Sequence, residues 1–296
     1  MNNILMQRYV ELGQSFDPNK INIQKSLRVN TLKISEQELV KRLTAKGAIL
    51  TKIPFLDNGY YYESNFSLGA TPEYLLGYYY LQEIASQLPA IVFDPKPGER
   101  ILDMCAAPGS KTTQIAQLMQ NKGVIIALDK KGERLPSLRN NIERCGVTNI
   151  IIYKKDARFA SDLKILFDRI LLDAPCSGNF ANEKDWFKLR DIAGIKQNTK
   201  VQKELLKEAV KCLKPNGVLV YSTCTLEPEE NEMNIHWLLN KYSNIKLEKI
   251  NIKIGDPGLI SVFGENLNPE IKKCRRLWPH KTGTQAFFIA KLIKRI

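Results

Sequence analysis

Residues 103–112 read Asp-Met-Cys-Ala-Ala-Pro-Gly-Ser-Lys-Thr and lie between two regular patterns. A short apolar segment of strand type precedes them, and a helical pattern begins at Lys111. Small side chains let a backbone approach a ligand closely, and the first amide groups of a following helix point at that ligand. The stretch therefore predicts a strand, a ligand-binding loop and a helix in succession.

Strands and helices are expected to alternate through the rest of the chain. The expected strands are 100–105, 124–128, 150–154, 169–173 and 217–222, with a last strand at 285–292. The expected helices are 111–120, 131–145, 195–213 and 229–240. Such alternation is typical of β-α-β units with a parallel sheet. We therefore expect an α/β protein with a doubly wound, Rossmann-like sheet.

Three aspartates stand at or just after the ends of three expected strands. In an open α/β sheet, ligands bind beyond the carboxyl ends of the strands. Asp129 is placed to accept both ribose hydroxyls of a nucleoside, Asp156 to meet an adenine amino group, and Asp173 to meet a cationic amine. Residues 109–112 lack the upstream glycine spacing of a phosphate loop. The pattern favours S-adenosylmethionine, and helix capping is the alternative for each single aspartate.

Pro95-Lys96-Pro97-Gly98 is a turn and the expected domain boundary. We expect an N-terminal α/β appendage at 1–94 and a larger domain with the ligand-binding sheet at 95–296. Within the appendage, the alternation of apolar and polar residues over 26–34 predicts a strand.

Two helices are expected in the appendage. Ser35 and Glu38 form a capping-box pattern for the first helix, and Gly47 ends it. The second begins at Thr71-Pro72-Glu73 and is expected to run through the three tyrosines at 78–80 to about Leu88.

The composition restricts the class of protein. The chain has 296 residues, a net charge of +13 and a pI of about 9.4, which suggests a polyanionic partner. Its six cysteines include no Cys-x-x-Cys pair and it has two histidines, so we expect no metal site. Neither a signal peptide nor an apolar run of membrane-spanning length appears, and we expect a cytoplasmic protein with free thiols.

Two of the cysteines stand in short motifs that follow apolar runs. Residues 173–178 read Asp-Ala-Pro-Cys-Ser-Gly, and residues 221–226 read Tyr-Ser-Thr-Cys-Thr-Leu. Two thiols beside a nucleoside pocket suggest covalent chemistry on a base. The residues alone leave open whether Cys176 or Cys224 is the nucleophile. The remaining cysteines are expected in packing roles, with Cys105 the one that adjoins the pocket.

These motifs resemble the signature motifs of RNA 5-methylcytosine methyltransferases, the family that contains Nop2, the Sun proteins and bacterial Fmu. The resemblance rests on 103–112, 173–178 and 221–226, on Glu-Pro-Glu-Glu-Asn-Glu at 227–232, and on Leu-Trp-Pro-His at 277–280. It covers roughly residues 26–292. It implies an S-adenosylmethionine-dependent methyltransferase fold with a small N-terminal α/β domain, and methyl transfer to carbon 5 of a cytosine in RNA.

The resemblance also implies a role for each thiol. Carbon 5 of cytosine is a poor nucleophile until a thiolate adds to carbon 6. The resemblance assigns that addition to Cys224, resolution of the adduct to Cys176, and hydrogen bonding or protonation of the base to Asp173. The expected cofactor-binding residues are Cys105, Ala106, Ala107, Pro108, Gly109, Ser110, Lys111, Asp129, Arg134, Asp156 and Asp173.

We expect a monomeric enzyme that binds tRNA, with ribosomal RNA as the alternative partner. Two other hypotheses stay open: a DNA cytosine methyltransferase, and a non-catalytic RNA-binding protein on the same fold. The basic cluster 272–276, Arg28, Asn30 and the tyrosines 60–62 are candidate RNA contacts. The loop Asn-Phe-Ala-Asn-Glu-Lys at 179–184 replaces the glycine and basic residues usual in the family.

Overall fold

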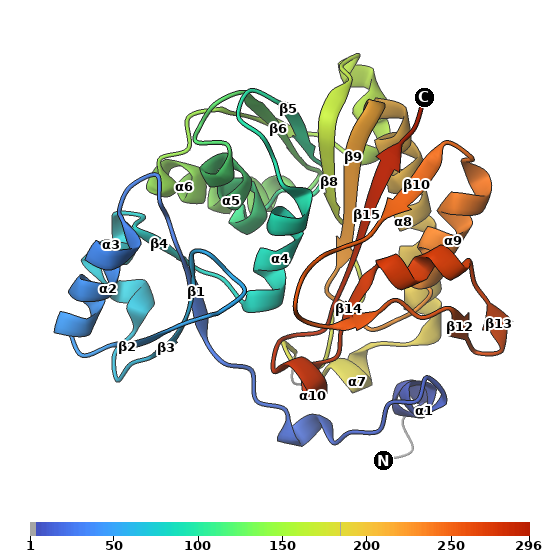
Figure 1. The fold of residues 1–296 in the computed structure, drawn as a ribbon, viewed down its shortest axis with the longest axis horizontal. Coiled ribbons are helices and arrows are strands. Elements are labelled where there is room, and N and C mark those ends of the chain that lie inside the picture. Colours follow the sequence, from blue (N-terminus) through green and yellow to red (C-terminus); the bar gives the residue numbers. More distant parts are fainter. Residues whose placement is uncertain (1–3, 184) are drawn as a thin grey trace.

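The computed structural model describes residues 4–183 and 185–296, and it contains two main sheets (Figure 1). A nine-stranded sheet is built from the residues that follow the N-terminal part, and a four-stranded sheet lies beside it. Among the described residues, no helix combines the length and the apolar character needed to cross a membrane.

The large sheet has parallel strands in the order β7-β6-β5-β8-β9, and β15 joins β9 in the antiparallel direction. These strands are β5 (Arg100–Asp103), β6 (Val124–Asp129), β7 (Ile150–Lys154), β8 (Phe167–Asp173), β9 (Leu213–Thr223) and β15 (Phe287–Lys294). The order reverses at β5, whose two neighbours β6 and β8 both follow it in the chain. This reversal is where doubly wound sheets bind ligands. The expected α/β fold and its strands are confirmed.

Short elements complete the sheet and its surroundings. The strands β10 (Ile245–Glu248) and β14 (Arg275–Leu277) pair with different parts of β15, and β11 (Asp256–Pro257) pairs with β14. A separate ribbon joins β12 (Ser261–Val262) to β13 (Glu265–Asn266). Short 3₁₀ turns occur at Pro18–Lys20, Leu68–Ala70, Gly132–Arg134, Ala157–Leu163 and Pro269–Lys273.

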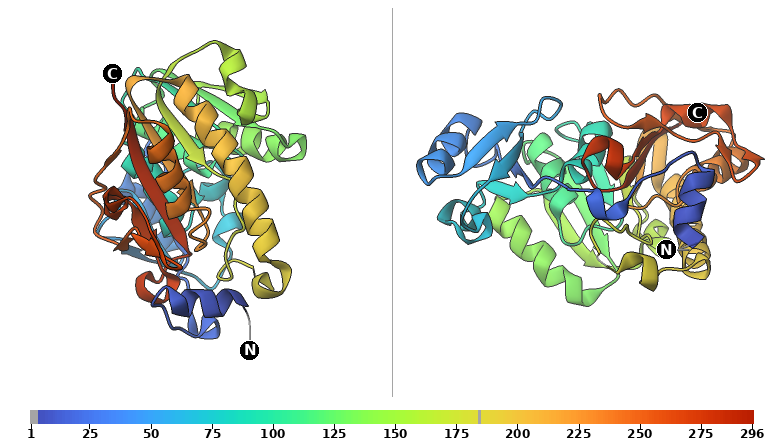
Figure 2. Two further views of the ribbon diagram at one scale, coloured as in Figure 1. Left: turned by 90° about the vertical axis from the view of Figure 1, so that its right-hand side faces the viewer. Right: turned by 90° about the horizontal axis from the view of Figure 1, so that it is seen from below.

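Helices cover both faces of the large sheet (Figures 1 and 2). One face carries α4 (Ile84–Phe93), α5 (Ser110–Leu118) and α6 (Leu135–Cys145), and the other carries α8 (Ile192–Cys212) and α9 (Glu232–Lys241). Successive strand residues therefore enter different cores: Ile101 packs in one and Leu102 in the other. This burial on both faces is the reason the parallel strands read as continuous apolar runs.

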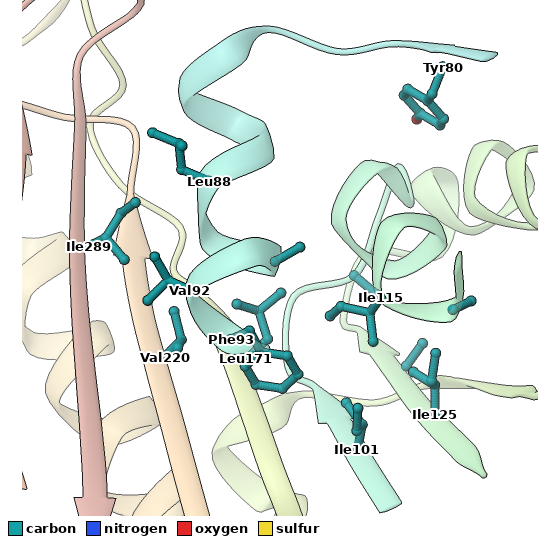
Figure 3. Packing of buried hydrophobic residues seen from close by; sticks show 14 of the residues in the cluster. Tyr80, Leu88, Val92, Phe93, Ile101, Ile115, Ile125, Leu171, Val220 and Ile289 are labelled. Atoms are coloured by element: carbon teal, nitrogen blue, oxygen red, sulfur yellow. The ribbon is translucent and has the colours of Figure 1, made fainter. Parts of the chain in front are cut away.

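The face under α4 has a closely packed core (Figure 3). Leu88 and Val92 of α4 point toward Ile289 of β15 and Val220 of β9. Phe93 at the end of the helix is fully buried and belongs to the same cluster. Helix α4 therefore packs on the large sheet, although its residues come before the expected domain boundary at residue 94. That boundary stays a prediction.

The N-terminal sheet has the order β2-β3-β1-β4. Its elements are β1 (Ser26–Val29), α2 (Glu36–Ala45), β2 (Ile49–Lys52), β3 (Gly59–Glu63), α3 (Pro72–Leu75) and β4 (Tyr79–Leu81). The expected helix start is confirmed, because Ser35 Oγ accepts the backbone N–H of Glu38 at 3.3 Å. The expected end is confirmed by Gly47, which follows the helix with φ +91°.

The helix expected from residue 72 to about residue 88 is wrong. The structure has the short helix α3, a turn at Gly77 with φ +73°, the strand β4 and then α4. A side chain at residue 77 would meet the Arg144 carbonyl oxygen at 1.7 Å. The close approach of α6 therefore requires a glycine that ends the helix, and this contact is not visible in the local sequence pattern.

The first described helix lies apart from the N-terminal sheet. Helix α1 (Ile4–Glu11) packs Leu5 and Tyr9 against Trp186 and Trp278, and the following residues cross to β1 (Figure 2). The two other short helices, α7 (Trp186–Leu189) and α10 (Pro279–Thr282), lie in this region (Figure 1). The segment from α1 to β1 thus joins the N-terminal sheet to the part of the chain around α7 and α10.

Arg28 and Asn30 are not available to RNA. Arg28 is 2% exposed and donates to Gln82 Oε1 at 2.9 Å and Thr113 Oγ1 at 3.0 Å. Asn30 Nδ2 donates to the carbonyl oxygens of Gly77 and Cys145, each at 2.8 Å. Both side chains connect the N-terminal sheet to helices of the large sheet, α5 for Arg28 and α6 for Asn30, which corrects their interpretation as RNA contacts.

Candidate active site

A pocket of about 300 Å³ lies beyond the carboxyl ends of β5, β6 and β8. It brings together residues from several of the predicted motifs, and its lining includes Cys105, Ala107, Asp129, Arg134, Asp156, Asp173, Cys176 and Cys224. The other expected cofactor residues do not line it: Ala106, Pro108, Gly109, Ser110 and Lys111. The 103–112 loop therefore lines the pocket with Met104, Cys105 and Ala107, and its other residues lie outside the lining.

Asp103 holds this loop in shape. Its side chain is 1% exposed, accepts the Thr112 hydroxyl at 2.7 Å and accepts the backbone N–H of Cys105 at 3.3 Å. Burial raises its pKa to about 6. Gly109, with φ +104°, precedes α5, and a Cβ there would lie 2.9 Å from Leu138 Cδ1. Sequence reasoning assigned Asp103 no role, although it stands at a strand end like the other aspartates.

Asp129 and Arg134 bind the loop from the side of β6. Asp129 is 4% exposed, and its carboxylate accepts the backbone N–H of Ala107 at 3.2 Å and that of Lys131 at 2.9 Å. Arg134 Nη1 pairs with Asp129 Oδ2 at 3.2 Å, and its other amino group donates to the Ala107 carbonyl oxygen. The predicted ribose acceptor is therefore already held rigidly at the pocket wall.

Asp156 lines the pocket, and both of its carboxylate oxygens accept hydrogen bonds from Arg158. Arg158 donates to its two oxygens from Nε, at 3.1 Å to each, and from Nη2, at 2.7 Å. These hydrogen bonds from Arg158 hold the pKa of Asp156 below its usual value. A ligand amino group at this carboxylate would share it with the guanidinium.

Cys176 and Cys224 are brought together by the pairing of β8 with β9. Asp173 and Ser222 are partners in this parallel ladder, so each thiol follows its strand end by a few residues. The two Sγ atoms lie 3.4 Å apart, and both side chains are partly exposed at the pocket. Asn179 Nδ2 donates to the Cys224 carbonyl oxygen at 2.9 Å, which holds the loop after Cys176 against Cys224. Lys184, also in that loop, lies outside the described residues.

The two thiols differ in acidity. A hydrogen bond from Cys176 lowers the pKa of Cys224, and the charge of Lys111 acts in the same direction. The same hydrogen bond, together with burial, raises the pKa of Cys176 well above its usual value. Because the thiolate is the nucleophilic form of cysteine, this difference is in the direction expected if Cys224 is the nucleophile. The residue pattern alone could not distinguish them.

Lys111 connects the 103–112 loop to Asp173 at the end of β8. Its Nζ lies 2.7 Å from Asp173 Oδ2 and 3.2 Å from Ser86 Oγ, and the side chain is buried. Ser222 Oγ donates to the other carboxylate oxygen of Asp173 at 2.7 Å. Lys111 was expected as a cofactor contact, whereas the structure pairs it with Asp173 at the mouth of the pocket.

The basic cluster 272–276 does not form a phosphate clamp as a unit. Arg276 and Glu232 form an ion pair in which both side chains are 0% exposed. Lys273 pairs with Glu270, and Cys274 is fully buried. Lys272 is exposed and Arg275 is partly exposed. The expectation for Arg276 is wrong because the partner that neutralises it lies in the 227–232 motif, 44 residues away.

A family model described as 16S rRNA methyltransferase RsmB/F matches residues 90–293. The chain belongs to the RsmB/F methyltransferase family. A second model, the N-terminal domain of 16S rRNA methyltransferase RsmF, matches residues 1–84. RsmB/F membership confirms the resemblance to RNA cytosine methyltransferases.

Relatives of this RsmB/F protein act on different RNAs. It is 40% identical over 99% of its length to a tRNA (cytosine(49)-C(5))-methyltransferase of Pyrococcus abyssi, of which it covers 96%. It is 38% identical to ribosomal RNA small subunit methyltransferase F of Vibrio parahaemolyticus over 92% of its own length, but it spans 57% of that protein. Its fold matches the crystal structure of NSun6 from Pyrococcus horikoshii with SFG, an S-adenosylmethionine analogue, at a TM-score of 0.83 and 32% identity, covering 94% of this chain and 92% of that one.

Proposed function

We propose that this protein transfers a methyl group from S-adenosylmethionine to carbon 5 of a cytosine in tRNA. The observation that carries the proposal is the pair of thiols 3.4 Å apart, beside the Asp173–Lys111 ion pair and at the mouth of a nucleoside-sized pocket. Two such thiols suit a reaction in which one group adds to the base and another assists its release. Membership in a methyltransferase family supports the same chemistry.

The residues of the pocket fit S-adenosylmethionine, which supplies an electrophilic methyl group when bound. Asp129 offers a fixed carboxylate for ribose hydroxyls, and Cys105 and Ala107 supply small groups along the wall. Asp173 places a negative charge where a sulfonium or amino group would be favoured. Among the described residues, no group of three or more His, Cys, Asp or Glu side chains is placed to hold a metal ion.

Each reacting side chain has a role in the proposed mechanism. The Cys224 thiolate adds to carbon 6 of cytosine, and Cys176 donates a hydrogen bond to that thiolate before the attack. Asp173 contacts the base as the adduct forms, with Lys111 holding its carboxyl group in position. After carbon 5 has been methylated, its proton passes to water and the C–H electron pair re-forms the double bond between carbons 5 and 6. The bond from Cys224 to carbon 6 breaks at the same time and returns the Cys224 thiolate, a step that Cys176 assists.

The choice of tRNA is supported by two relatives from Pyrococcus. The chain is 40% identical to the tRNA (cytosine(49)-C(5))-methyltransferase of Pyrococcus abyssi and 45% identical, over 77% of its length, to a tRNA (cytosine(72)-C(5))-methyltransferase of Pyrococcus horikoshii. Ribosomal RNA is the second candidate, since the matching family model describes a 16S rRNA methyltransferase. We also propose that the enzyme works in the cytoplasm as a monomer.

Methyl transfer to defined nucleic acids tests this function. The purified protein is incubated with methyl-labelled S-adenosylmethionine and, separately, with unmodified tRNA, ribosomal RNA and DNA. Label should enter tRNA, and bisulfite sequencing should place it at carbon 5 of one cytosine. Label in ribosomal RNA alone would show that ribosomal RNA, and not tRNA, is the substrate. Label in DNA alone would contradict the assignment to RNA.

Asp129→Ala is expected to weaken S-adenosylmethionine binding by about 1.5–3 kcal/mol, because charge-assisted hydrogen bonds to the ribose are lost. Calorimetry measures the change, and RNA affinity should stay close to that of the wild-type protein. Since Asp129 also holds Ala107 and Lys131, circular dichroism must show that the variant is folded. Unchanged cofactor affinity in a folded variant would remove Asp129 from the site.

A further inference from the structure

A buried carboxyl group beside the thiols has no role in the chemistry above. Glu230 follows β9 and is 0% exposed. Both of its oxygens accept the backbone N–H of Ser177 at 3.2 Å, and Oε2 also accepts from Gln202 Nε2 at 2.5 Å. In the described part of the chain, no ion pair joins Glu230 to a cation. Burying a carboxyl group without a cation is costly, so its presence here needs a physical reason.

The hydrogen bonds favour the charged form of Glu230. Ser177 N–H and Gln202 Nε2 both donate to Glu230, and a side-chain hydrogen bond with Ser177 also favours its charged form. A protonated carboxyl group would have one fewer site at which to accept these hydrogen bonds. Burial raises the pKa of Glu230 to about 7, and the donors oppose that increase. The group therefore becomes negatively charged as the pH rises through neutrality.

Glu230 and Gln202 hold both sides of Cys176. Ser177, the residue after Cys176, donates its N–H to Glu230. Gln202 Nε2 donates to the carbonyl oxygen of Pro175, the residue before Cys176, at 2.9 Å. The backbone on either side of Cys176 is therefore held by two buried side chains, Glu230 and Gln202, that are hydrogen-bonded to each other.

The charge of Glu230 also acts on the thiols. It opposes ionisation of Cys176, after the larger effects of the Cys224 hydrogen bond and of burial, and it is a weaker opposing influence on Cys224. A nearby negative charge keeps a thiol protonated to higher pH.

We propose that Glu230 is a positioning residue for the second thiol: it holds Cys176 Sγ beside Cys224 Sγ and keeps the shared proton on Cys176. Cys224 is then the member of the pair that carries the negative charge and adds to the base. The consequence for catalysis rests on the proposed function. The effect on the two thiols is a property of the protein alone and can be measured without RNA.

Other charged groups near the pair stay in place when Glu230 is changed. Asp173 of β8 opposes ionisation of Cys224, and Lys111 of α5 favours it. Glu227 precedes Glu230 in the same turn and raises its pKa. Tyr221 of β9 is neutral, because burial raises its pKa well above the usual value. A shift produced by substitution of Glu230 therefore reports the charge of Glu230.

The test is alkylation of the RNA-free protein by iodoacetamide over a range of pH, with mass spectrometry of the Cys176 and Cys224 peptides. Glu230→Gln keeps the size of the side chain and an acceptor oxygen for Ser177, but it removes the charge. The midpoint of the alkylation profile should move to lower pH by about 0.5–1 unit, because a negative charge that opposed ionisation is gone. Cys176 should also react at a rate closer to that of Cys224.

Glu227→Gln is the matched control. Glu227 is equally buried, at 0% exposed, but it accepts from Tyr9 Oη at 2.7 Å and pairs with Arg8 rather than with the Cys176 loop. The alkylation midpoint of the two thiols in the Glu227→Gln variant should stay at the wild-type value. A folded Glu230→Gln variant with an unmoved midpoint would overturn the proposal, and so would an equal shift in the Glu227→Gln control.

Two further measurements cover the other outcomes. If Glu230→Gln does not fold, Glu230→Asp keeps the charge but withdraws it from Ser177, so Cys176 should become more reactive relative to Cys224; an unchanged ratio rejects the proposal. With substrate RNA, the covalent adduct should decay more slowly in Glu230→Gln than in the wild type. If the wild-type protein methylates no RNA and the Cys176→Ala variant forms no adduct, the proposed function fails while the alkylation result still stands.

Discussion

Cys224→Ser is expected to lower methylation by at least about a thousandfold, the scale of losing a catalytic nucleophile. A serine hydroxyl has no dedicated base here and does not ionise near neutral pH, whereas the Cys224 thiol is favoured as a thiolate by Cys176 and Lys111. Denaturing electrophoresis with labelled RNA should show no covalent complex. Cofactor binding, measured in parallel, should remain.

Cys176→Ala should stop turnover by a different route. Cys224 can still add to carbon 6, but release of the product stalls, and a denaturation-resistant protein–RNA complex should accumulate. Cys274→Ala is the control, because that thiol is fully buried on the C-terminal side and touches neither sulfur of the pair. A shifted band with Cys224→Ser and none with Cys176→Ala would reverse the two roles. Full activity in both variants would reject the covalent mechanism.

Arg276→Met is expected to lower the free energy of unfolding by about 3–5 kcal/mol, the cost of leaving a buried charge without its partner. Arg276 donates to Glu232 from Nε at 2.8 Å and to the Leu226 carbonyl oxygen from Nη1 at 2.6 Å. Its guanidinium also lies 4.8 Å from the centre of the Trp278 ring. Urea denaturation followed by circular dichroism measures the change.

Lys272→Met provides the comparison, since Lys272 is exposed and lies in the same basic cluster. It should change stability by less than about 0.5 kcal/mol. Adding Glu232→Gln to Arg276→Met should recover part of the lost stability, because the unpaired charge is removed. Equal stability of the Arg276 and Lys272 variants would mean that the buried ion pair does not stabilise the fold.

Much of the local structure could be predicted because its causes are local. Ser35 and Glu38 mark a helix start within four residues, and the apolar runs that end near Asp129 and Asp173 have the length of buried strands. The predicted helix through Tyr78–Tyr80 failed for the opposite reason. Gly77 is required by the backbone of Arg144, which lies far away in the sequence.

For the active site, the sequence by itself determined the order of strands and helices, the acidic residues at their ends and the presence of two thiols in distinct motifs. The tertiary structure decided which groups interact. Cys176 and Cys224 are 48 residues apart in the chain but share a hydrogen bond because β8 and β9 are neighbours in the sheet. Lys111 reaches Asp173 across 62 residues, and Arg276 is withdrawn from solvent by Glu232. Acidity and burial depend on such distant partners, because charge interactions act through space and local sequence patterns carry no record of them.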